Sequence, residues 1–333
     1  MAKESLKEIL ERGEQVFAPC IWDCLSARAA EVCGYKASLL SSCLFAWSAA
    51  GIPDFGLVTL DEVEWAVKRI SEATALPLII DAEDGYGPTT LHCYRAIDRL
   101  TKAGASAFTI EDSVAIRGTE RHFTYDEKGN RIDGNKPSGI ISEKAWLSKI
   151  EAALAATEGT DAMIIARTHA YSSEGLDAAI DRAAKATKLG AQMTYVAIPH
   201  WQDNRPLCRK IAERLPGWKM YGDVFSRDGK TDIELDEAMQ LGFNLVTMHC
   251  FQFGAFYGMC DVGKHNIQNG NTIYSDELRK GGDWLKKEML EMQDYHSAKM
   301  LEIEKKCFDK AEEFYNRPAA FSASMQTNGG NEK

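Results

Sequence analysis

The feature of this sequence that most restricts its fold is a repeated alternation of short apolar runs with longer segments of helical periodicity. Each run is rich in aliphatic side chains and ends in polar or glycine residues, which is typical of a strand buried on both faces of a parallel sheet. Eight such units favour a closed barrel over an open sheet. The predicted class is therefore α/β, a (β/α)8 TIM-type barrel with additional C-terminal helices. The runs predicted as strands cover residues 16–18, 37–40, 78–80, 107–110, 162–166, 193–198, 219–224 and 244–248.

Changes in composition along the chain predict where the barrel is interrupted and where it ends. We expect the barrel to cover residues 1–275, with a long charged and glycine-containing segment at about 113–140. A segment of this length inside a domain is commonly a lid or is disordered, and a plain surface loop is the alternative. Residues 276–316 have the pattern of charged amphipathic helices. Residues 317–333 have tail composition and are predicted to be disordered.

The overall charge excludes some classes of partner. The formal net charge of −10 argues against general attraction to nucleic acid or to an anionic membrane surface, so an anionic substrate needs a local cation or a metal. No apolar run approaches the roughly 20 residues of a membrane span, and no signal peptide is evident. Nine cysteines are scattered without a CxxC pair or zinc spacing, as in a reduced protein. A cytoplasmic location is the expectation.

The third predicted strand ends in acids. The apolar run 78–80 breaks into Asp81 and Glu83, and the loops after the carboxyl ends of barrel strands are where catalytic residues collect. Two positions two apart on an extended backbone point to the same side. Two carboxylates facing one way suit a hard cation such as Mg²⁺, which prefers about six oxygen ligands. The alternative is a solvated acidic turn.

Polar side chains follow several other predicted strands. Their mixture fits a metal held by carboxylates together with an arginine fork that binds a carboxylate or phosphoryl group. Alternatives exist for each: Asp54 could order a loop, Glu111 could pair with Arg167 as a structural bridge, and a histidine at a strand end could simply be hydrogen-bonded. The residues expected at the mouth of the barrel are Ser41, Ser42, Asp54, Asp81, Glu83, Glu111, Arg167, His169 and His249.

Four motifs in the same order resemble those of the isocitrate lyase and phosphoenolpyruvate mutase superfamily, over roughly residues 14–250. They are Asp81-Ala82-Glu83-Asp84-Gly85-Tyr86-Gly87, Ile110-Glu111-Asp112, Ala166-Arg167-Thr168 and Gly51-Ile52-Pro53-Asp54. The similarity is to lyases of the 2-methylisocitrate and dimethylmalate type. It implies a barrel that depends on Mg²⁺, or on Mn²⁺, and acts on α-hydroxy or α-oxo acids. It also implies a homo-oligomer, a tetramer built as a dimer of dimers, in which the last helices are exchanged between subunits.

Carried over by position, the resemblance assigns roles to individual residues. Asp81 and Glu83 would hold the metal, and Glu111 would complete its shell through water. Arg167 would bind an oxygen of the intermediate and Asp54 would orient the substrate. The common species of the family is an enolate, whose charge a divalent cation and a guanidinium stabilise. The substrate-binding set is Ser41 with the backbone of Ser42 and Cys43, together with Arg167 and His169.

This sequence departs from the family pattern in three places. Glu83 stands where an Asp is usual, and Ala197 stands where the lyases carry a Glu. Residues 113–140 lack the lyases' lid cysteine, and Ser113 replaces the lysine of the phosphonate-forming mutases. We therefore expect His122 or Tyr125 to replace the missing proton donor, because a histidine titrates near neutrality and a closing loop can complete a site. The alternative is that Arg117 and Arg121 close over an anionic substrate.

The leading functional prediction is a carbon–carbon lyase acting on a small 2-hydroxy or 2-oxo polycarboxylate through an enolate-type intermediate. The runner-up, in the same barrel, is phosphoenolpyruvate mutase or phosphonopyruvate hydrolase chemistry, or hydrolysis or decarboxylation of oxaloacetate, which does not need the lid cysteine. A third possibility is a homologue that binds a metabolite without turning it over. The expected partner is thus a small carboxylate or phosphonate, and neither nucleic acid nor membrane.

Overall fold

The computed structural model describes residues 3–114, 139–200, 202–280 and 297–307. The chain divides into two compact units, Met1–Asp276 and Glu277–Lys333. In the second unit the described structure includes the helix α14 (Ser297–Cys307). The predicted exchange of helices from 276–316 between subunits stays a prediction, and the predicted tail at 317–333 lies outside the described residues.

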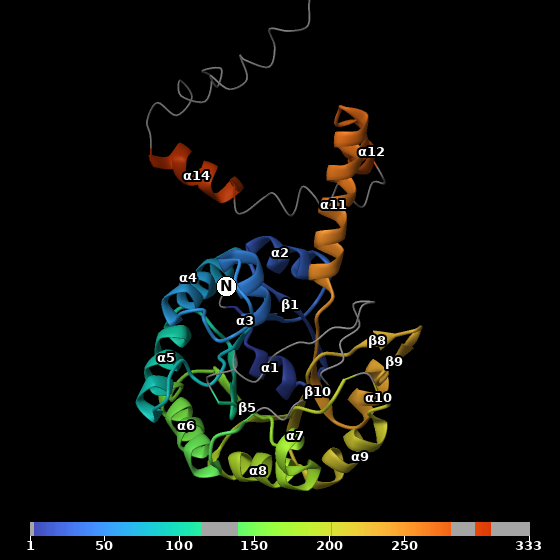
Figure 1. Cartoon of the computed structure of the whole chain (residues 1–333). Coiled ribbons are helices and arrows are strands. Elements are labelled where there is room, and N and C mark those ends of the chain that lie inside the picture. Colours follow the sequence, from blue (N-terminus) through green and yellow to red (C-terminus); the bar gives the residue numbers. More distant parts are fainter. Residues whose placement is uncertain (1–2, 115–138, 201, 281–296, 308–333) are drawn as a thin grey trace, which may run out of the picture. The chain divides into compact units, whose positions relative to one another are not determined.

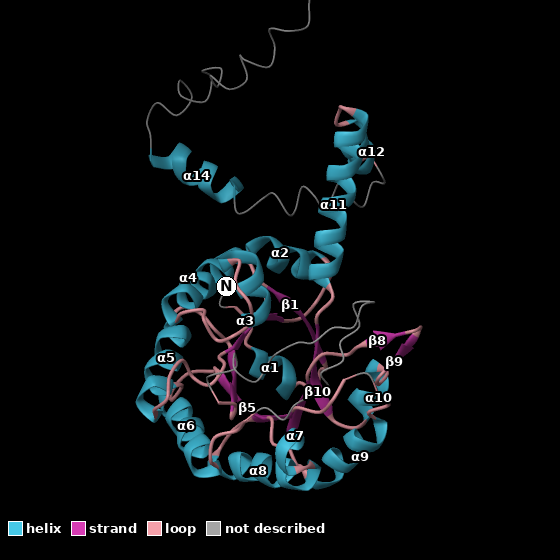
Figure 2. Cartoon of the chain, viewed as in Figure 1, coloured by secondary structure: helices cyan, strands magenta, loops and turns pink. Residues whose placement is uncertain are grey.

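The first unit is built on a closed barrel of eight parallel strands, which confirms the predicted fold (Figures 1 and 2). Neighbouring strands follow the order of the chain, and the last strand pairs with the first to close the ring. Every predicted apolar run overlaps one of these strands, although the runs predicted at 193–198 and 219–224 extend past the observed strand ends. They are β1 (Val16–Ile21), β2 (Ser38–Leu40), β3 (Leu78–Asp81), β4 (Ala107–Glu111), β5 (Met163–Thr168), β6 (Met193–Val196), β7 (Trp218–Tyr221) and β10 (Phe243–Met248).

Helices surround the strands, and their first residues are capped by side chains that the sequence supplies. The side chain of Asp23 accepts a hydrogen bond from the Ser26 amide, and Thr59 caps the next long helix in the same way. Each helix buries one apolar face against the barrel. The helices are α2 (Cys24–Val32), α4 (Leu60–Ala73), α5 (Thr90–Lys102), α6 (Glu143–Ala156), α8 (Leu176–Leu189), α9 (Arg205–Arg214) and α10 (Leu235–Gln240), with short turns at α3 (Ser42–Phe45), η1 (Ala46–Ala50) and α7 (Tyr171–Glu174).

The helix α1 (Leu6–Glu11) closes the amino-terminal end of the barrel. Its residues Leu6, Ile9 and Leu10 are buried in one cluster with interior strand residues such as Met163. The Leu6 amide also donates to the hydroxyl of Ser106, which directly precedes β4, at 3.1 Å. A ligand site therefore belongs at the opposite end, where the carboxyl ends of the strands meet.

Two elements were not predicted from the sequence. A small hairpin joins β8 (Ser226–Arg227) to β9 (Lys230–Thr231) after the seventh barrel strand. The helix α11 (Phe251–Asn269) follows the last strand, and α12 (Ile273–Arg279) comes after it. Glycines at three positions of α11, which disfavour helix, hide its periodicity in the sequence. None of the helices in the described ranges is both long and apolar enough to cross a membrane.

Candidate active site

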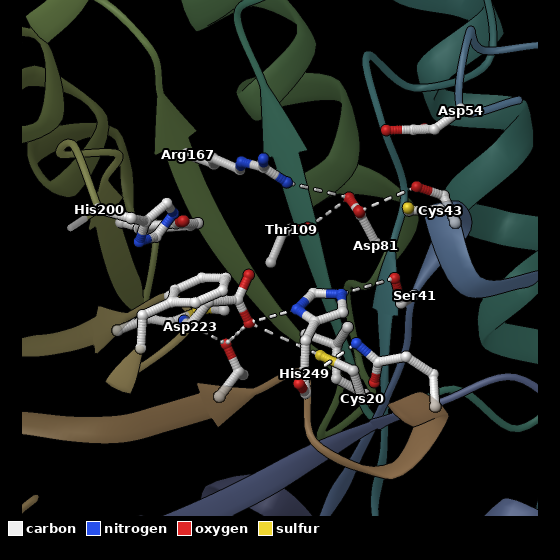
Figure 3. A pocket seen from close by; sticks show the side chains of 18 of the residues that line it. Cys20, Ser41, Cys43, Asp54, Asp81, Thr109, Arg167, His200, Asp223 and His249 are labelled. Carbon is white, nitrogen blue, oxygen red and sulfur yellow. Dashed lines mark hydrogen bonds and ion pairs between the residues drawn. The ribbon is translucent and has the colours of Figure 1, made fainter. Parts of the chain in front are cut away.

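A cavity of about 310 Å³ opens at the carboxyl ends of the barrel strands (Figure 3). Strands and loops from around the whole ring contribute to its wall, so it lies at the mouth of the barrel. Most of the residues predicted for the mouth are there. The lining includes Ser41, Ser42, Cys43, Asp54, Asp81, Thr109, Arg167, Tyr195, His200, Asp223 and His249.

Asp81 is the last residue of β3 and is held by three neighbours. Its Oδ2 accepts from the Ser42 hydroxyl at 3.0 Å, and its Oδ1 accepts from the Thr109 hydroxyl at 3.1 Å. Arg167 Nη1 lies 3.3 Å from the same Oδ1. The predicted acid at the third strand exit and the predicted arginine at the fifth are therefore in direct contact, although 86 positions separate them in the sequence.

The same arginine nitrogen also contacts the acid of the fourth strand. Arg167 Nη1 lies 3.3 Å from Glu111 Oε2, and His169 Nε2 lies 3.1 Å from that oxygen. The Ser113 hydroxyl donates to the other carboxylate oxygen of Glu111. The structure thus contains the Glu111–Arg167 pair that the sequence offered as an alternative. His169 contacts the same oxygen of Glu111 as Arg167 does.

Glu83 does not share a face with Asp81 in the way that strand alternation predicts. The strand β3 ends at Asp81, and Glu83 has a left-handed backbone with φ +53°, so the premise of an extended chain was wrong at this residue. Glu83, Glu111 and Ser113 line a second cavity of about 380 Å³, whereas Asp81 lines the first. Glu83 is only 8% exposed and Asp84 only 9%, which rules out a solvated acidic turn.

The acids next to the predicted ligands have structural partners. Lys149, which is 3% exposed, donates to the Asp84 carbonyl at 2.7 Å and pairs with its carboxylate at 3.3 Å. Asp112 is fully buried and accepts from the Thr168 hydroxyl at 2.6 Å and from the His169 amide at 2.7 Å. Arg182 Nε also donates a hydrogen bond to Asp112 Oδ2, at 3.1 Å. These contacts fix the backbone next to Glu83, Glu111 and His169.

Arg167 itself is half-buried, and nearby acidic groups influence its pKa. Burial, the largest influence, would lower the pKa of Arg167, but the nearby Asp81, Tyr195 and Glu83 outweigh it and raise that pKa. The guanidinium carbon lies 5.2 Å from the centre of the Tyr195 ring, at cation–π distance. Burial raises the pKa of Tyr195 to about 12, so its hydroxyl keeps its proton. Arg167 Nε is buried and has no hydrogen-bond partner within the described structure.

On the opposite wall, a carboxylate, an imidazole and a hydroxyl form a chain that the sequence reasoning missed. Asp223 Oδ1 lies 2.6 Å from His249 Nδ1, and His249 Nε2 lies 3.2 Å from Ser41 Oγ (Figure 3). His249 was expected at the mouth, but its link to Asp223 was not. The available signal was the position of Asp223 near the end of the seventh predicted strand, 219–224, although the observed β7 already ends at Tyr221. The left-handed backbone of Asp223, with φ +58°, is what turns it toward β10.

Cys20, Asp223 and His249 also form a possible metal-binding group. One ligand atom from each lies within 4.8 Å of the others, and across the described residues the predicted acids Asp81, Glu83 and Glu111 form no such group. The 2.6 Å contact between Asp223 Oδ1 and His249 Nδ1 is a hydrogen-bond distance, so these two groups are paired with each other in the structure.

The predicted lid cannot be placed on this geometry. His122 and Tyr125, and with them Arg117 and Arg121, lie outside the described residues. The two ends of the segment do lie together, because Ser113 pairs with Ile140 in an antiparallel bridge and the Val114 amide donates to the Gly139 carbonyl at 2.8 Å. Ser113, at the first end, also contacts Glu111 through its hydroxyl.

Comparison with known proteins identifies the family. The family model described as phosphoenolpyruvate phosphomutase matches residues 6–262. The chain belongs to the phosphoenolpyruvate phosphomutase family. This agrees with the superfamily that the four motifs indicate, and the chain's relatives in it are named lyases.

Relatives of this chain carry several different names of activity. A 2-methylisocitrate lyase of Escherichia coli (strain K12) is 36% identical over 50% of this chain and 52% of its own. An oxaloacetate decarboxylase of Paraburkholderia xenovorans (strain LB400) is 33% identical over 54% and 56%. The matches thus span only about half the length of these relatives. A crystal structure of 2,3-dimethylmalate lyase superposes with a TM-score of 0.66 at 25% identity, covering 80% of this chain and 87% of that chain.

Proposed function

We propose that this protein is a Mg²⁺-dependent carbon–carbon lyase that acts on a small 2-hydroxy or 2-oxo polycarboxylate. The observation that carries the proposal is Arg167, a half-buried guanidinium at the cavity wall whose Nη1 joins the acids of two strands and whose buried Nε has no hydrogen-bond partner among the described residues. An arginine with a spare donor at a cavity wall suits a carboxylate or an enolate oxygen. The named activities of the relatives support the same substrate class.

The donor set fits a divalent cation. Asp81, Glu83 and Glu111 offer only oxygen ligands, the type that Mg²⁺ and Mn²⁺ prefer. Asp81 Oδ2, which accepts from Ser42, lies on the wall of the same cavity as Arg167. When bound, the cation supplies positive charge that stabilises an enolate oxygen. In this proposal Asp81 is the direct ligand, and Glu83 and Glu111 act from the neighbouring cavity through water.

The remaining residues of the chain bind and orient the acid. Ser41, Ser42 and Cys43 line the cavity after β2, and in this proposal the two serines and the backbone of Cys43 would bind the substrate carboxylate. Asp54 lines the same cavity and would orient the substrate. Arg167, backed by the Tyr195 ring, would bind the oxygen on which negative charge develops. His122 and Tyr125 stay candidates for completing the site from the lid.

A substrate panel tests the proposal. Purified protein is assayed with 2-methylisocitrate, 2,3-dimethylmalate, oxaloacetate and phosphonopyruvate, in Mg²⁺, in Mn²⁺ and after treatment with EDTA. We expect cleavage of a hydroxy polycarboxylate that EDTA abolishes and Mg²⁺ restores, measured as release of a 2-oxo acid. Turnover that is indifferent to EDTA, or no turnover of any acid, would contradict the proposal.

Oxaloacetate or phosphonopyruvate chemistry is the second candidate, and a specific observation favours it. Ala197 follows β6, and its amide donates to the Thr168 carbonyl at 2.9 Å. Because the residue is an alanine, this position offers no carboxylate where the lyases carry a Glu. The 33% identity to an oxaloacetate decarboxylase points the same way. Release of CO₂ or phosphate with no cleavage of the hydroxy acids would select this candidate. Binding of oxalate without turnover of any acid would select a metabolite-binding role.

We also propose that the protein assembles as a homotetramer. Large side chains of α11 are exposed at helical spacing, among them Phe253, Phe256 and Tyr257, each about 70% exposed. An apolar helix face of this kind favours a second copy of the chain as its cover. Light scattering with size exclusion tests this, and a monomer at micromolar concentration would contradict it. The nine free cysteines support a cytoplasmic location, which cell fractionation would check.

A further inference from the structure

The proposed reaction needs a group that moves a proton, and the lid lacks the family's cysteine. The described structure contains a histidine suited to that task on the wall opposite Arg167. His249 lines the cavity at the end of β10, and one ring nitrogen is fixed by a carboxylate while the other faces a hydroxyl. A histidine whose Nδ1 is held by a carboxylate keeps a defined tautomer and orientation.

We propose that His249 is the general base and general acid of this site, with Asp223 as its positioning residue and Ser41 as the hydroxyl between Nε2 and the substrate. The inference rests on the proposed function, because it supplies the proton transfer that this reaction requires. It differs from the expectation for the lid, since the transferring group then lies on the barrel itself.

His249 alone can carry out both proton transfers of the cleavage. Neutral His249 accepts the proton of the substrate hydroxyl, directly or through Ser41, as the carbon–oxygen bond becomes a carbonyl and the adjacent carbon–carbon bond breaks. The electron pair of the broken bond passes to the second fragment. The resulting imidazolium then donates the same proton to the carbanionic carbon of that fragment. No co-reactant is consumed, and His249 returns to its neutral form.

The electrostatic surroundings allow both protonation states to be used. Burial, the largest influence, would lower the pKa of His249, but its hydrogen bond and charge interaction with Asp223 outweigh burial and raise it. The pKa of Asp223 is lowered despite burial, because of His249. Further groups act on the imidazole from other elements: Asp81 on β3 raises the pKa, Arg167 on β5 lowers it, and His200 and Cys20 lie nearby in the same network.

A purely structural role for the pair predicts something different. If Asp223 and His249 only brace the wall, replacing His249 would lower the stability or the affinity for every ligand. A proton-transfer role predicts that ligand binding survives while turnover is lost. The test therefore measures both quantities on the full-length protein with Mg²⁺ present.

The central variant is His249→Gln, which keeps a polar side chain of similar reach but cannot carry a proton. On the acid that the wild type cleaves, we expect kcat to fall by about 10²–10⁴-fold, the usual contribution of a general acid–base group. We expect the affinity for oxalate, measured by calorimetry, to change by less than about threefold, which is under 1 kcal/mol. His265→Gln, on α11 and stacked on Tyr274, is the matched control and should leave both values unchanged.

The second variant, Asp223→Asn, tests the positioning role through a pH profile. Removing the carboxylate lowers the pKa of His249. The rising limb of kcat/KM, which reports the neutral base, should therefore move to lower pH, and maximal kcat should fall as well. A change in stability alone would not move that limb.

Each possible result either supports or overturns the proposed role of His249. Lost turnover with retained oxalate binding in His249→Gln, and a shifted limb in Asp223→Asn, support the inference. Unchanged turnover in His249→Gln, or an unmoved limb in Asp223→Asn, would overturn the inference and leave the proposed function intact. A wild type that cleaves none of the acids in the panel overturns the proposed function and the inference together.

Discussion

Gly222 lies directly against the hydroxyl of Tyr195. A Cβ atom built at Gly222 would overlap the oxygen and the ring edge of that tyrosine. Tyr195 in turn packs its ring against the guanidinium of Arg167, 5.2 Å from the ring centre. The missing side chain at one position of the wall therefore sets where the arginine of the cavity lies.

Replacement of Gly222 by Ala should displace Tyr195 and with it Arg167. We expect a loss of about 1–3 kcal/mol in the free energy of unfolding, the usual cost of overpacking, together with a raised KM. Urea denaturation and steady-state kinetics measure the two effects. Gly263→Ala is the control, because a Cβ there meets no atom within 4 Å. Equal effects from both variants would argue against the steric explanation.

Asp81 and Asp84 should respond in opposite ways to loss of charge, although both belong to the same motif. Asp81→Asn should abolish the Mg²⁺ dependence, seen as loss of the calorimetric signal for Mg²⁺, and should cost less stability than Asp84→Asn because Arg167 keeps Glu111 as a second partner. Asp84→Asn removes the carboxylate from the buried Lys149 and should cost about 3 kcal/mol of stability. A variant Asp84→Asn that loses the Mg²⁺ signal while unfolding normally would reverse this assignment.

Asp112 should be among the residues on which stability depends most. It is fully buried and contacts Thr168, the His169 amide and Arg182. Asp112→Ala would leave Arg182 buried without its carboxylate, at a cost of about 3–5 kcal/mol measured by denaturant unfolding. Asp177→Ala is a suitable comparison, because Asp177 makes its ion pair with Arg214 at the exposed surface, and we expect no measurable change.

Stability should fall at alkaline pH, partly through Cys93. Burial raises the pKa of Cys93 from 9.0 to about 12, so the folded protein holds the thiol proton more tightly than the unfolded chain does. Its contribution is present in full below pH 9 and is lost as the pH rises toward 12. Tm measured between pH 8 and 11 should therefore fall less steeply in Cys93→Ala than in the exposed control Cys33→Ala. Parallel curves would contradict this.

The barrel could be predicted from the sequence because each strand is a local signal. Runs such as 78–80 and 162–166 are apolar and bounded by polar residues, so their burial on both faces can be read directly. Asp81 and Arg167 could be placed at the mouth for the same reason, because each stands at the end of such a run. The motif resemblance added the family, which the comparison confirmed.

Local signals fail where the backbone turns unexpectedly. Glu83 and Asp223 both have left-handed backbones, which cannot be predicted from the residue type. The alternation of side chains along a strand therefore gave the wrong side for Glu83, and no sequence pattern indicated the contact of Asp223 with His249. The contact between His249 and Ser41 joins residues 208 positions apart. Contacts of this kind depend on how the ring closes, and a single sequence contains no pattern for them.

The antiparallel bridge between Ser113 and Ile140 has a consequence for how such a chain can diversify. The polypeptide leaves the wall and returns to it at one point, so the pairing of β4 with β5 does not depend on what is inserted between them. Lineages of this barrel can therefore lengthen, shorten or replace that insert wholesale while every strand keeps its register.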